Sequence, residues 1–489
     1  MTLSTLRVLA RAALLLALAV LTGCETSPAT GRTFFSGGMS AEDEAKLGAE
    51  QHGKVQQQFG GPYDDPALSA YVTSLGNFLA ETSELPDLEF TFTVLDSPII
   101  NAFALPGGYV YVTRGLVALA DNEAELAGVM AHEIGHVTAR HSAERYGQAV
   151  GAQVLAGAVG LVFGGGAETQ AVQGVSVLAL KSWSRDQEFE ADLLGVRYLT
   201  RAGFDPQAMA GFLEALQAHA RLEAEIAGRP GAADEFSLLQ THPRTTDRIE
   251  VAMKQAGIQA VPDPIVGRDI YLKKIDGIVY GDSPENGFVR GQRFLHPVLR
   301  LAFEVPQGFR LINSQSQVLA LGPEGAGIAF NLAPKSQGIA PRDYLTQVWA
   351  KNISLQNVEN ININGMAAAT GQARISTRGG AKDARLVVVR YDNTYMYRFL
   401  FLTNPSQTPG LAEAFKRTTY SFRKLSAAEA AEIKPMRLRI HQVQAGETAA
   451  SIAERFPFDS FRLERFLVLN GFDRNVAVSP GQQVKIITQ

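Results

Sequence analysis

One short motif, His132-Glu133-Ile134-Gly135-His136, constrains the fold of this chain more than any other feature. It lies in a helical pattern that starts at Asp121 or Asn122 and extends to about residue 147. Residues four positions apart on an α-helix lie one turn apart on the same face. The fold must therefore present two imidazoles side by side, with a carboxylate next to them. Because burying that carboxylate without a partner is costly, the motif favours a built site over a coincidence of spacing.

Two imidazoles in this arrangement are typical ligands of a zinc ion. Zinc accepts neutral imidazole nitrogens and, in catalytic sites, keeps one coordination position open for water. Glu133 lies beside that position and can take the proton of the water as a general base. The chain has only 8 histidines in 489 residues, so a chance match to the motif is rare. We therefore predict one Zn2+ per chain with His132 and His136 as ligands.

The third ligand is expected from a second predicted helix at about 184–202, which is rich in acidic residues. Four carboxylates lie in its first turns: Asp186, Glu188, Glu190 and Asp192. Asp186 shares a helix face with Glu190, and Glu188 shares one with Asp192, so spacing alone leaves the choice open. A solvated acidic face is the alternative. A further histidine, His141, lies about 140° around the first helix from His136, and we expect it to be a surface residue.

Several further segments surround the motif in a fixed order: Asn101-Ala102-Phe103-Ala104-Leu105-Pro106-Gly107-Gly108, Val112-Thr113-Arg114-Gly115-Leu116, Glu188-Phe189-Glu190-Ala191-Asp192, and Thr241-His242-Pro243 with Arg248-Ile249. Together with the histidine motif, they resemble the gluzincin metallopeptidase family, which contains the prenyl-protein (CaaX) protease and the bacterial heat-shock membrane protease. The resemblance is greatest to the soluble periplasmic branch, which includes the β-barrel assembly-enhancing protease. It covers about residues 40–255. No 34-residue helical repeat follows, so substrates and partners do not transfer with the chemistry.

The resemblance assigns roles to five residues around the predicted ion. It implies that His132, His136 and Glu188 are the zinc ligands and that Glu133 is the general base. It also implies that Asp192 is a carboxylate behind the ligands, which holds one ligand histidine in the right tautomer.

Three further roles follow from the same resemblance. His242 lies in a loop that approaches the metal in this family, where it either stabilises the oxyanion or fills the open zinc position and keeps the enzyme latent. The alternative for His242-Pro243 is a simple helix-start turn. Arg248 either assists catalysis or pins that loop. The predicted hairpin 99–113 offers an edge on which an extended substrate adds a strand, through the residues Asn101, Ala102, Phe103 and Ala104, with plain core sheet as the alternative.

The N-terminus predicts export and a lipid anchor. Two arginines precede an apolar run of about ten residues, too short to span a bilayer, and the run ends in Leu21-Thr22-Gly23-Cys24. This ending resembles the bacterial lipobox, so residues 1–24 are interpreted as a lipoprotein signal peptide with Cys24 as the lipidated residue. Glu25 after the cysteine favours the outer membrane over the inner one. The chain is then lipid-anchored and faces the periplasm.

The rest of the chain predicts a multidomain protein. Residues 25–39 are expected to be a flexible tether, and residues 40–262 a mainly α-helical zincin catalytic domain with a small β-sheet and hairpin. Within this domain, residues 148–180 are expected to be a buried or loosely packed helical pair, because each half is too short for a membrane span. Residues 265–425 alternate as strands and predict an α+β domain with an antiparallel sheet and an unknown role. Residues 438–489 resemble a small βααβ LysM-like module, a type that commonly binds peptidoglycan.

Composition narrows the function further. A net charge of −4 provides no basic surface, so nucleic acid is excluded as a partner. We expect a zinc-dependent endopeptidase acting on misfolded or misassembled cell-envelope proteins. The alternative is a chaperone-like or scaffolding envelope lipoprotein whose zinc site is latent or only structural.

Overall fold

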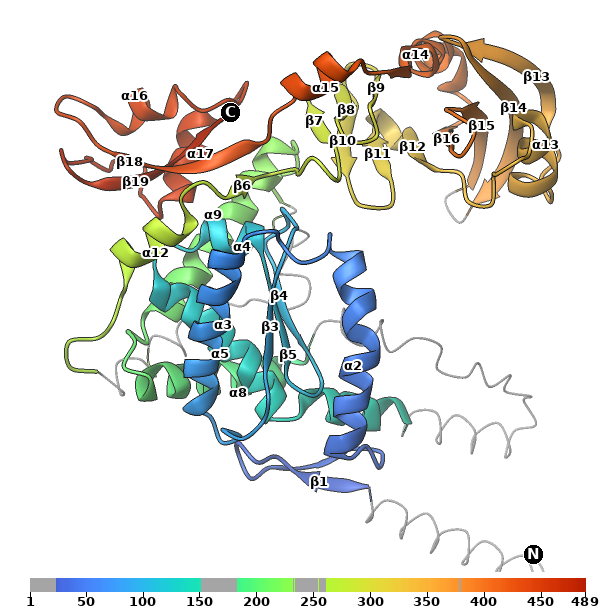
Figure 1. Cartoon of the computed structure of the whole chain (residues 1–489). Coiled ribbons are helices and arrows are strands. Elements are labelled where there is room, and N and C mark those ends of the chain that lie inside the picture. Colours follow the sequence, from blue (N-terminus) through green and yellow to red (C-terminus); the bar gives the residue numbers. More distant parts are fainter. Residues whose placement is uncertain (1–22, 151–182, 232, 234–253, 255–260, 378–379) are drawn as a thin grey trace, which may run out of the picture. The chain divides into compact units, whose positions relative to one another are not determined.

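The computed structural model describes residues 23–150, 183–231, 233, 254, 261–377 and 380–489. These residues form two compact units. Unit 1 comprises the described residues up to Tyr280 together with Arg437–Thr488, and unit 2 comprises Gly281–Met436. Figure 1 shows the helices and strands of each unit. The prediction of a multidomain chain with helices and several antiparallel sheets is confirmed.

Unit 1 begins with a short antiparallel hairpin made of β1 (Cys24–Thr26) and β2 (Thr33–Phe35). The composition of this stretch predicts a tether, but the structure pairs it into strands. Arg32 beside β2 forms ion pairs with Glu144 at 2.8 Å and with Glu190 at 3.1 Å. These long-range contacts hold the hairpin on the helical part of unit 1, and a local composition pattern does not reveal them.

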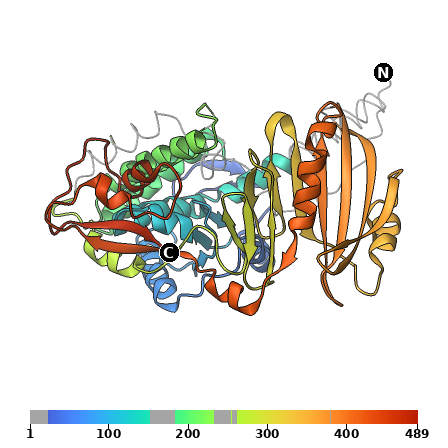
Figure 2. The same ribbon diagram turned by 90° about the horizontal axis from the view of Figure 1, so that it is seen from above.

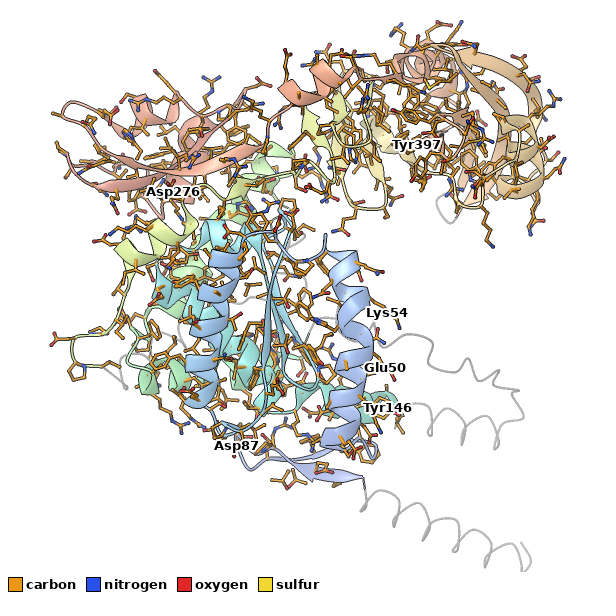
Figure 3. The ribbon with its side chains drawn as sticks, in the orientation of Figure 1. Glu50, Lys54, Asp87, Tyr146, Asp276 and Tyr397 are labelled. Carbon is orange, nitrogen blue, oxygen red and sulfur yellow. The ribbon has the colours of Figure 1, made fainter. Side chains whose placement is uncertain are left out.

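Helix α2 (Ala41–Gln58) begins directly after its cap Ser40. The hydroxyl of Ser40 accepts the backbone N–H of Asp43, and the carboxylate of Asp43 accepts the backbone N–H of Ser40. This reciprocal capping box satisfies two donors at the helix start. Glu50 and Lys54 lie on the exposed face of the helix (Figure 3).

A three-stranded sheet lies beside the next helix of unit 1. The elements are α3 (Pro66–Glu81), β3 (Thr91–Leu95), β4 (Ala102–Leu105) and β5 (Tyr109–Thr113). The strand order is β3-β5-β4, with β3 parallel and β4 antiparallel to β5. The predicted hairpin 99–113 is therefore confirmed. Its turn needs Gly107 and Gly108, whose φ angles of 81° and 92° disfavour residues with a Cβ.

The helix that carries the histidine motif is shorter than the pattern predicts. It is α5 (Glu123–Thr138), which begins after its cap Asn122. A separate helical stretch follows at 141–150. Between the two, Arg140 takes a left-handed backbone conformation with φ 58°, and its side chain pairs with Glu44 at 2.7 Å. The prediction of one helix to about 147 is therefore wrong, because a tertiary ion pair stabilises a break that no local glycine or proline signals.

Two long helices pack against α5. They are α8 (Arg185–Arg201), which starts with a capping box at Ser184, and α9 (Ala208–Ile226). Most of the segment predicted as a helical pair, residues 151–182, lies outside the described part of the chain. Among the residues that are described, no helix combines the length and apolar character that crossing a membrane requires.

A segment from far along the chain completes unit 1. Its elements are β18 (Met436–Gln442), α16 (Ala449–Ala453), α17 (Arg462–Leu469) and β19 (Gln483–Thr488). With β6 (Val279–Tyr280), which follows α12 (Arg268–Ile275), the strands form a sheet in the order β19-β18-β6. The predicted succession of strand, helix, helix and strand is observed. The assignment as a LysM-like module stays a prediction.

One buried lysine joins this segment to the rest of unit 1. Lys485 on β19 is fully buried, and its Nζ donates to the carbonyls of Ala118, Leu119 and Ala120 at 3.2, 2.9 and 2.9 Å. These carbonyls lie at the end of α4 (Arg114–Leu119), directly before α5. The same ammonium pairs with Asp121 at 2.9 Å. The C-terminal segment therefore contacts the turn from which the motif helix begins.

Unit 2 contains two antiparallel sheets. A seven-stranded sheet has the order β10-β11-β12-β16-β15-β14-β13, and a four-stranded sheet has the order β17-β9-β8-β7. The strands are β7 (Phe288–Arg290), β8 (Arg293–His296), β9 (Leu301–Glu304), β10 (Arg310–Asn313), β11 (Val318–Leu321), β12 (Gly327–Leu332), β13 (Gln356–Ile363), β14 (Met366–Thr377), β15 (Gly380–Arg390), β16 (Met396–Thr403) and β17 (Arg423–Lys424). The helical elements are η2 (Pro323–Gly325), α13 (Pro341–Asp343), η3 (Tyr344–Trp349), α14 (Thr408–Ser421) and α15 (Ala427–Glu432). Strands β15 and β16 form a hairpin across Asp392-Asn393.

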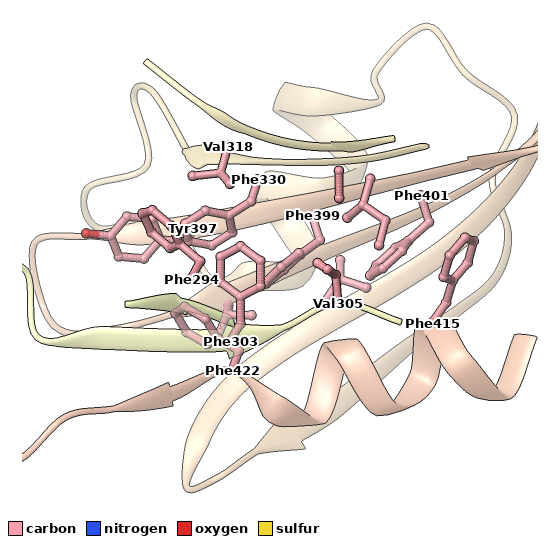
Figure 4. Close-up of a cluster of buried hydrophobic side chains, with 14 of the residues drawn as sticks. Phe294, Phe303, Val305, Val318, Phe330, Tyr397, Phe399, Phe401, Phe415 and Phe422 are labelled. Atoms are coloured by element: carbon pink, nitrogen blue, oxygen red, sulfur yellow. The ribbon is translucent and has the colours of Figure 1, made fainter. Parts of the chain in front are cut away.

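The core of unit 2 contains a cluster of aromatic side chains. Phe303, Phe330 and Phe399 lie in contact, with ring centroids 4.7 to 5.2 Å apart. Figure 4 shows this cluster, and Figure 2 shows helix α14 lying along the strands that carry part of it. Phe415 extends the cluster from α14. Burial of these rings supplies the large apolar area that holds sheets and helix together.

Candidate metal centre

Helix α5 presents both histidines of the motif to one point. The side chains of His132 and His136 are buried, with 6% and 2% of their surface exposed. Their Nε2 atoms lie 3.0 Å apart. The structure therefore produces the convergence that four-residue spacing on a helix predicts.

Helix α8 brings one carboxylate to the same point. Glu188 is fully buried, with Oε1 3.4 Å from Nε2 of His136 and Oε2 4.0 Å from Nε2 of His132. One ligand atom from each of the three residues lies within 4.8 Å of the others. Ligands about 2.0 Å from a tetrahedral zinc are separated by about 3.3 Å, so this donor set of two nitrogens and one carboxylate oxygen fits that ion.

Glycines allow the two helices to approach closely. A Cβ built at Gly135 on α5 would lie 3.1 Å from the carbonyl oxygen of Ala191 on α8. A Cβ built at Gly195 on α8 would lie 3.2 Å from the backbone nitrogen of His132. Both distances are shorter than ordinary van der Waals contact, so a larger residue at either position would push the helices apart. The ligand geometry thus depends on these two glycines.

Burial sets the charge of the histidine at the centre of the group. Burial lowers the pKa of His136 well below its usual value, against the opposing effect of the nearby Glu188 carboxylate. The imidazole is therefore held neutral, which is the form that binds a metal ion.

Asp192 lies where the resemblance implies. It is buried one helical turn after Glu188, and its Oδ1 is 2.9 Å from Nδ1 of His132. A carboxylate at Nδ1 leaves Nε2 of the same ring as the metal-facing nitrogen. The face of α8 that spacing leaves undecided is therefore resolved by geometry, because Glu188 and Asp192 both face α5.

The general-base candidate is also buried at this site. Glu133 follows His132 on α5 and is 1% exposed.

Strand β4, which holds Ala102, Phe103 and Ala104, contacts α5 and lies at one edge of the three-stranded sheet. Asn101 directly precedes the strand and is buried as well.

His141 is placed differently from the prediction. It is fully buried, and its Nδ1 lies 2.8 Å from Nδ1 of His136. The expectation of a surface residue is therefore wrong. It assumed a continuous helix, whereas the left-handed conformation of Arg140 redirects the chain and brings His141 back toward the site.

Two other residues near the site escape sequence reasoning. The indole of Trp183 stacks on the His136 ring with centroids 4.5 Å apart and planes inclined by 20°. The guanidinium of Arg145 lies 3.5 Å from the centre of the Trp183 ring. Trp183 directly precedes the cap of α8, and an aromatic residue next to a predicted ligand helix is the one signal that points to it.

Three sequence predictions lie away from this group or beyond the described structure. His242 and Arg248 fall outside the described residues. Cys24 is exposed at the start of β1.

Comparison with known proteins agrees with the geometry. Residues 66–256 match the sequence profile of Peptidase family M48. This part of the chain is similar to the M48 peptidases. Over 222 residues the chain is 36% identical to the beta-barrel assembly-enhancing protease of Escherichia coli (strain K12), with 43% of each chain covered. Over 233 residues it is 32% identical to the mitochondrial metalloendopeptidase OMA1 of Schizosaccharomyces pombe, covering 47% of this chain and 65% of that protein.

A third relative gives a match of similar length and identity. The putative beta-barrel assembly-enhancing protease of Vibrio cholerae is 37% identical over 202 residues, or 40% of each chain. The chain therefore spans less than half the length of the bacterial relatives that it matches. These similarities support the metallopeptidase architecture around the three ligand candidates.

Proposed function

We propose that this chain is a zinc-dependent endopeptidase that hydrolyses peptide bonds of misfolded or misassembled cell-envelope proteins. One observation carries the proposal: His132, His136 and Glu188, from two helices far apart in the sequence, place their ligand atoms around one buried point. This convergence occurs inside the region that matches the M48 profile.

His132, His136 and Glu188 would hold the ion. Bound there, zinc supplies a water of lowered pKa and polarises the carbonyl of the scissile bond. Two neutral imidazoles and one carboxylate leave a coordination position open, as catalytic zinc sites require. Asp192 keeps the His132 ring oriented through its contact with Nδ1.

Glu133 acts on the attacking water. Its carboxylate follows His132 on the same helix, so it takes the proton of the water during attack and passes it to the leaving amine. Its burial excludes bulk water from the proton transfer.

Two further assignments complete the site. An extended substrate would add to the edge of β4 along Asn101–Ala104, because β4 contacts α5 and backbone pairing tolerates many sequences. His242 would stabilise the oxyanion or occupy the open zinc position in a latent state, with Arg248 assisting catalysis or fixing its loop.

The cellular setting rests on the N-terminal motif and on the relatives. We assign the chain to the periplasmic side of a membrane, the outer membrane in preference to the inner one, with Cys24 as the lipidated residue. Cys24 is exposed and therefore open to modification. The relatives named for β-barrel assembly support envelope proteins as substrates.

The decisive test compares the wild type with Glu133→Gln. We expect the variant to bind one zinc ion per chain and to lose cleavage of casein by a factor of about 100 to 10,000, since the general base is gone while the ligands remain. Glu123→Gln, on the same helix but away from the ligands, is the matched control and should keep its activity. Zinc content by elemental analysis and casein digestion with and without a chelator measure both quantities.

Two results would contradict the proposal. Chelator-insensitive cleavage excludes a metallopeptidase. Zinc retained without cleavage in the wild type, together with unchanged envelope phenotypes in Glu133→Gln cells, favours the scaffolding alternative. Cosedimentation of the full chain with peptidoglycan tests the LysM-like assignment, and a chain that stays in the supernatant removes that role.

A further inference from the structure

A second histidine lies directly behind one of the proposed zinc ligands. His141 Nδ1 is 2.8 Å from His136 Nδ1, on the side of the ring opposite to the ligand group. On its own far side, His141 Nε2 is 3.2 Å from Oε2 of Glu190. His136, His141 and Glu190 therefore form a chain of contacts that leads from the proposed metal centre to helix α8.

The groups at the two ends of this chain of contacts determine which ring nitrogen of each histidine carries the hydrogen. His136 directs Nε2 toward His132 and Glu188, so a neutral His136 ring carries its hydrogen on Nδ1. That Nδ1–H needs an acceptor, and the facing nitrogen of His141 accepts only if it carries no hydrogen. His141 then bears its hydrogen on Nε2, where the Glu190 carboxylate accepts it.

Glu190, at the far end of this chain of contacts, is held in place by further hydrogen bonds. Glu190 also accepts hydrogen bonds from Oγ1 of Thr30 at 2.6 Å and from Nε of Arg32 at 3.1 Å. Arg32 binds Glu144 through both of its terminal nitrogens, at 2.9 and 2.8 Å. The N-terminal hairpin thus holds the carboxylate that orients His141.

We propose that His141 is a positioning residue for the zinc ligand His136, which it holds through Nδ1 as the middle member of a His136–His141–Glu190 relay. This inference rests on the proposed function, because it assigns zinc to Nε2 of His136. The two ligand histidines then have different supports. The Asp192 carboxylate lies directly against Nδ1 of His132, whereas a second imidazole stands between Nδ1 of His136 and the Glu190 carboxylate.

The break in the helix after α5 brings His141 into contact with His136. On a continuous helix His141 would lie about 140° from His136, out of reach of its ring. The left-handed Arg140 brings it back, and the Trp183 ring stacked on His136 closes another side of the imidazole. Arg140 and Trp183 therefore both help to position His136, and neither is itself a proposed zinc ligand.

The test uses two substitutions of equal polarity that differ in where the acceptor lies. In His141→Asn the side-chain amide takes the place of Nδ1 and can accept from His136. In His141→Gln the side-chain amide takes the place of Nε2 and cannot accept a hydrogen bond from His136. We expect His141→Asn to bind zinc within about 3-fold of the wild type, and His141→Gln to bind about 10 to 100 times more weakly. Competition with a chromogenic chelator measures the affinity, and the visible spectrum of the cobalt-loaded chain reports the ligand geometry.

Three further variants make the result independent of folding defects. Glu190→Ala leaves His141 in place but removes its acceptor, so zinc affinity should fall several-fold, while Asp186→Ala on the same helix should have no effect. His441, which contacts Glu447 at 2.6 Å elsewhere in unit 1, provides a matched histidine–glutamate pair, and His441→Gln should bind zinc normally. Thermal unfolding of the metal-free chains identifies any variant that does not fold.

The outcomes separate this inference from the proposed function. Equal zinc affinity in the wild type and all His141 and Glu190 variants overturns the relay alone. Equal loss in His141→Asn and His141→Gln also overturns it, because position then has no influence. A wild-type chain that binds no zinc overturns both the relay and the proposed function.

Discussion

Each ligand histidine at the metal centre is supported by a partner that makes no contact with the ion. His132 faces Asp192 at 2.9 Å, and His136 faces His141 at 2.8 Å. Such partners set the tautomer and the ring orientation, and they raise the basicity of the ligand. At the scale of single residues, zinc affinity therefore depends on side chains that a ligand list omits.

Asp192→Ala is expected to weaken zinc binding by a factor of about 10 to 100, because His132 loses the acceptor at Nδ1. Asp192→Asn retains an acceptor oxygen and should lose less. Asp186→Ala, an exposed carboxylate on the same helix, serves as the control. Chelator competition gives the affinities, and a similar affinity for Asp192→Ala and wild type would remove Asp192 from the site.

A buried histidine in unit 2 predicts a dependence of stability on pH. Burial lowers the pKa of His296 to about 4, and its Nδ1 accepts the backbone N–H of Leu299. Since the unfolded chain binds the proton at about pH 6.5, this contribution is fully present above that pH and is lost as the pH falls toward 4. We expect it to lower the free energy of unfolding by ~2 kcal/mol between pH 7 and pH 5.

Urea denaturation of His296→Asn measures this contribution, since the asparagine amide can replace Nδ1 but does not titrate. The chain has 2 tryptophans, so in a Trp183→Phe background the fluorescence of Trp349 reports on unit 2. The pH dependence should be flatter in the variant by the stated amount. An identical dependence in both chains would show that His296 is not the titrating group.

At the scale of elements, the site is a junction of two helices. Neither α5 nor α8 holds the ion alone, and their separation decides whether Glu188 reaches the histidines. Gly135 and Gly195 set that separation, because a Cβ at either position would meet the opposite helix at 3.1 or 3.2 Å. Helix packing is thus part of the metal site.

Gly195→Leu is expected to reduce zinc affinity by a factor of ten or more, although it changes no ligand. Leucine favours helix formation over glycine by roughly 0.8 kcal/mol, so any loss must come from the displaced helix. Gly211→Leu on α9 is the matched control, because a Cβ there meets only the Glu125 carboxylate, at 3.8 Å. Zinc affinity and circular dichroism of both variants decide the matter, and normal binding by Gly195→Leu would refute the packing argument.

Local signals account for what the sequence predicts correctly at this scale. The cap at Ser40, the turn at Gly107-Gly108 and the motif spacing are all encoded within a few residues, and each is found in the structure. The break at Arg140 depends on an ion pair with Glu44, almost a hundred residues earlier. The sequence close to Arg140 therefore does not predict the break. His141 was misplaced for that reason alone.

At the scale of the whole molecule, unit 1 is built from two distant parts of the chain. Lys485 lies in a fully buried position, where burial lowers its pKa while Asp121 opposes this effect. Burial, together with the charge of Asp121, also raises the pKa of nearby Glu125 on α5 to about 7. The C-terminal segment is therefore a structural part of the region that contains the metal centre.

Lys485→Met is expected to destabilise unit 1 by about 3 to 5 kcal/mol, because the buried Asp121 then loses its closest ionic partner and keeps only Arg268, at 3.7 Å. The double variant Asp121→Asn/Lys485→Met should recover part of that loss. Lys54→Met, on the exposed face of α2 shown in Figure 3, should change stability by less than about 0.5 kcal/mol. Denaturation followed by Trp183 fluorescence in a Trp349→Phe background gives the three values, and a stable Lys485→Met would contradict the structural role.

The contact between Lys485 and the end of α4 also orders events during biosynthesis. Lys485 follows Ala120 by 365 residues, so the motif helix is made long before its stabilising strand exists. At about 5 to 20 residues per second, the interval is on the order of 20 to 70 s. The nascent chain therefore holds the motif helix without the buried contacts of Lys485 until translation has reached the last strand.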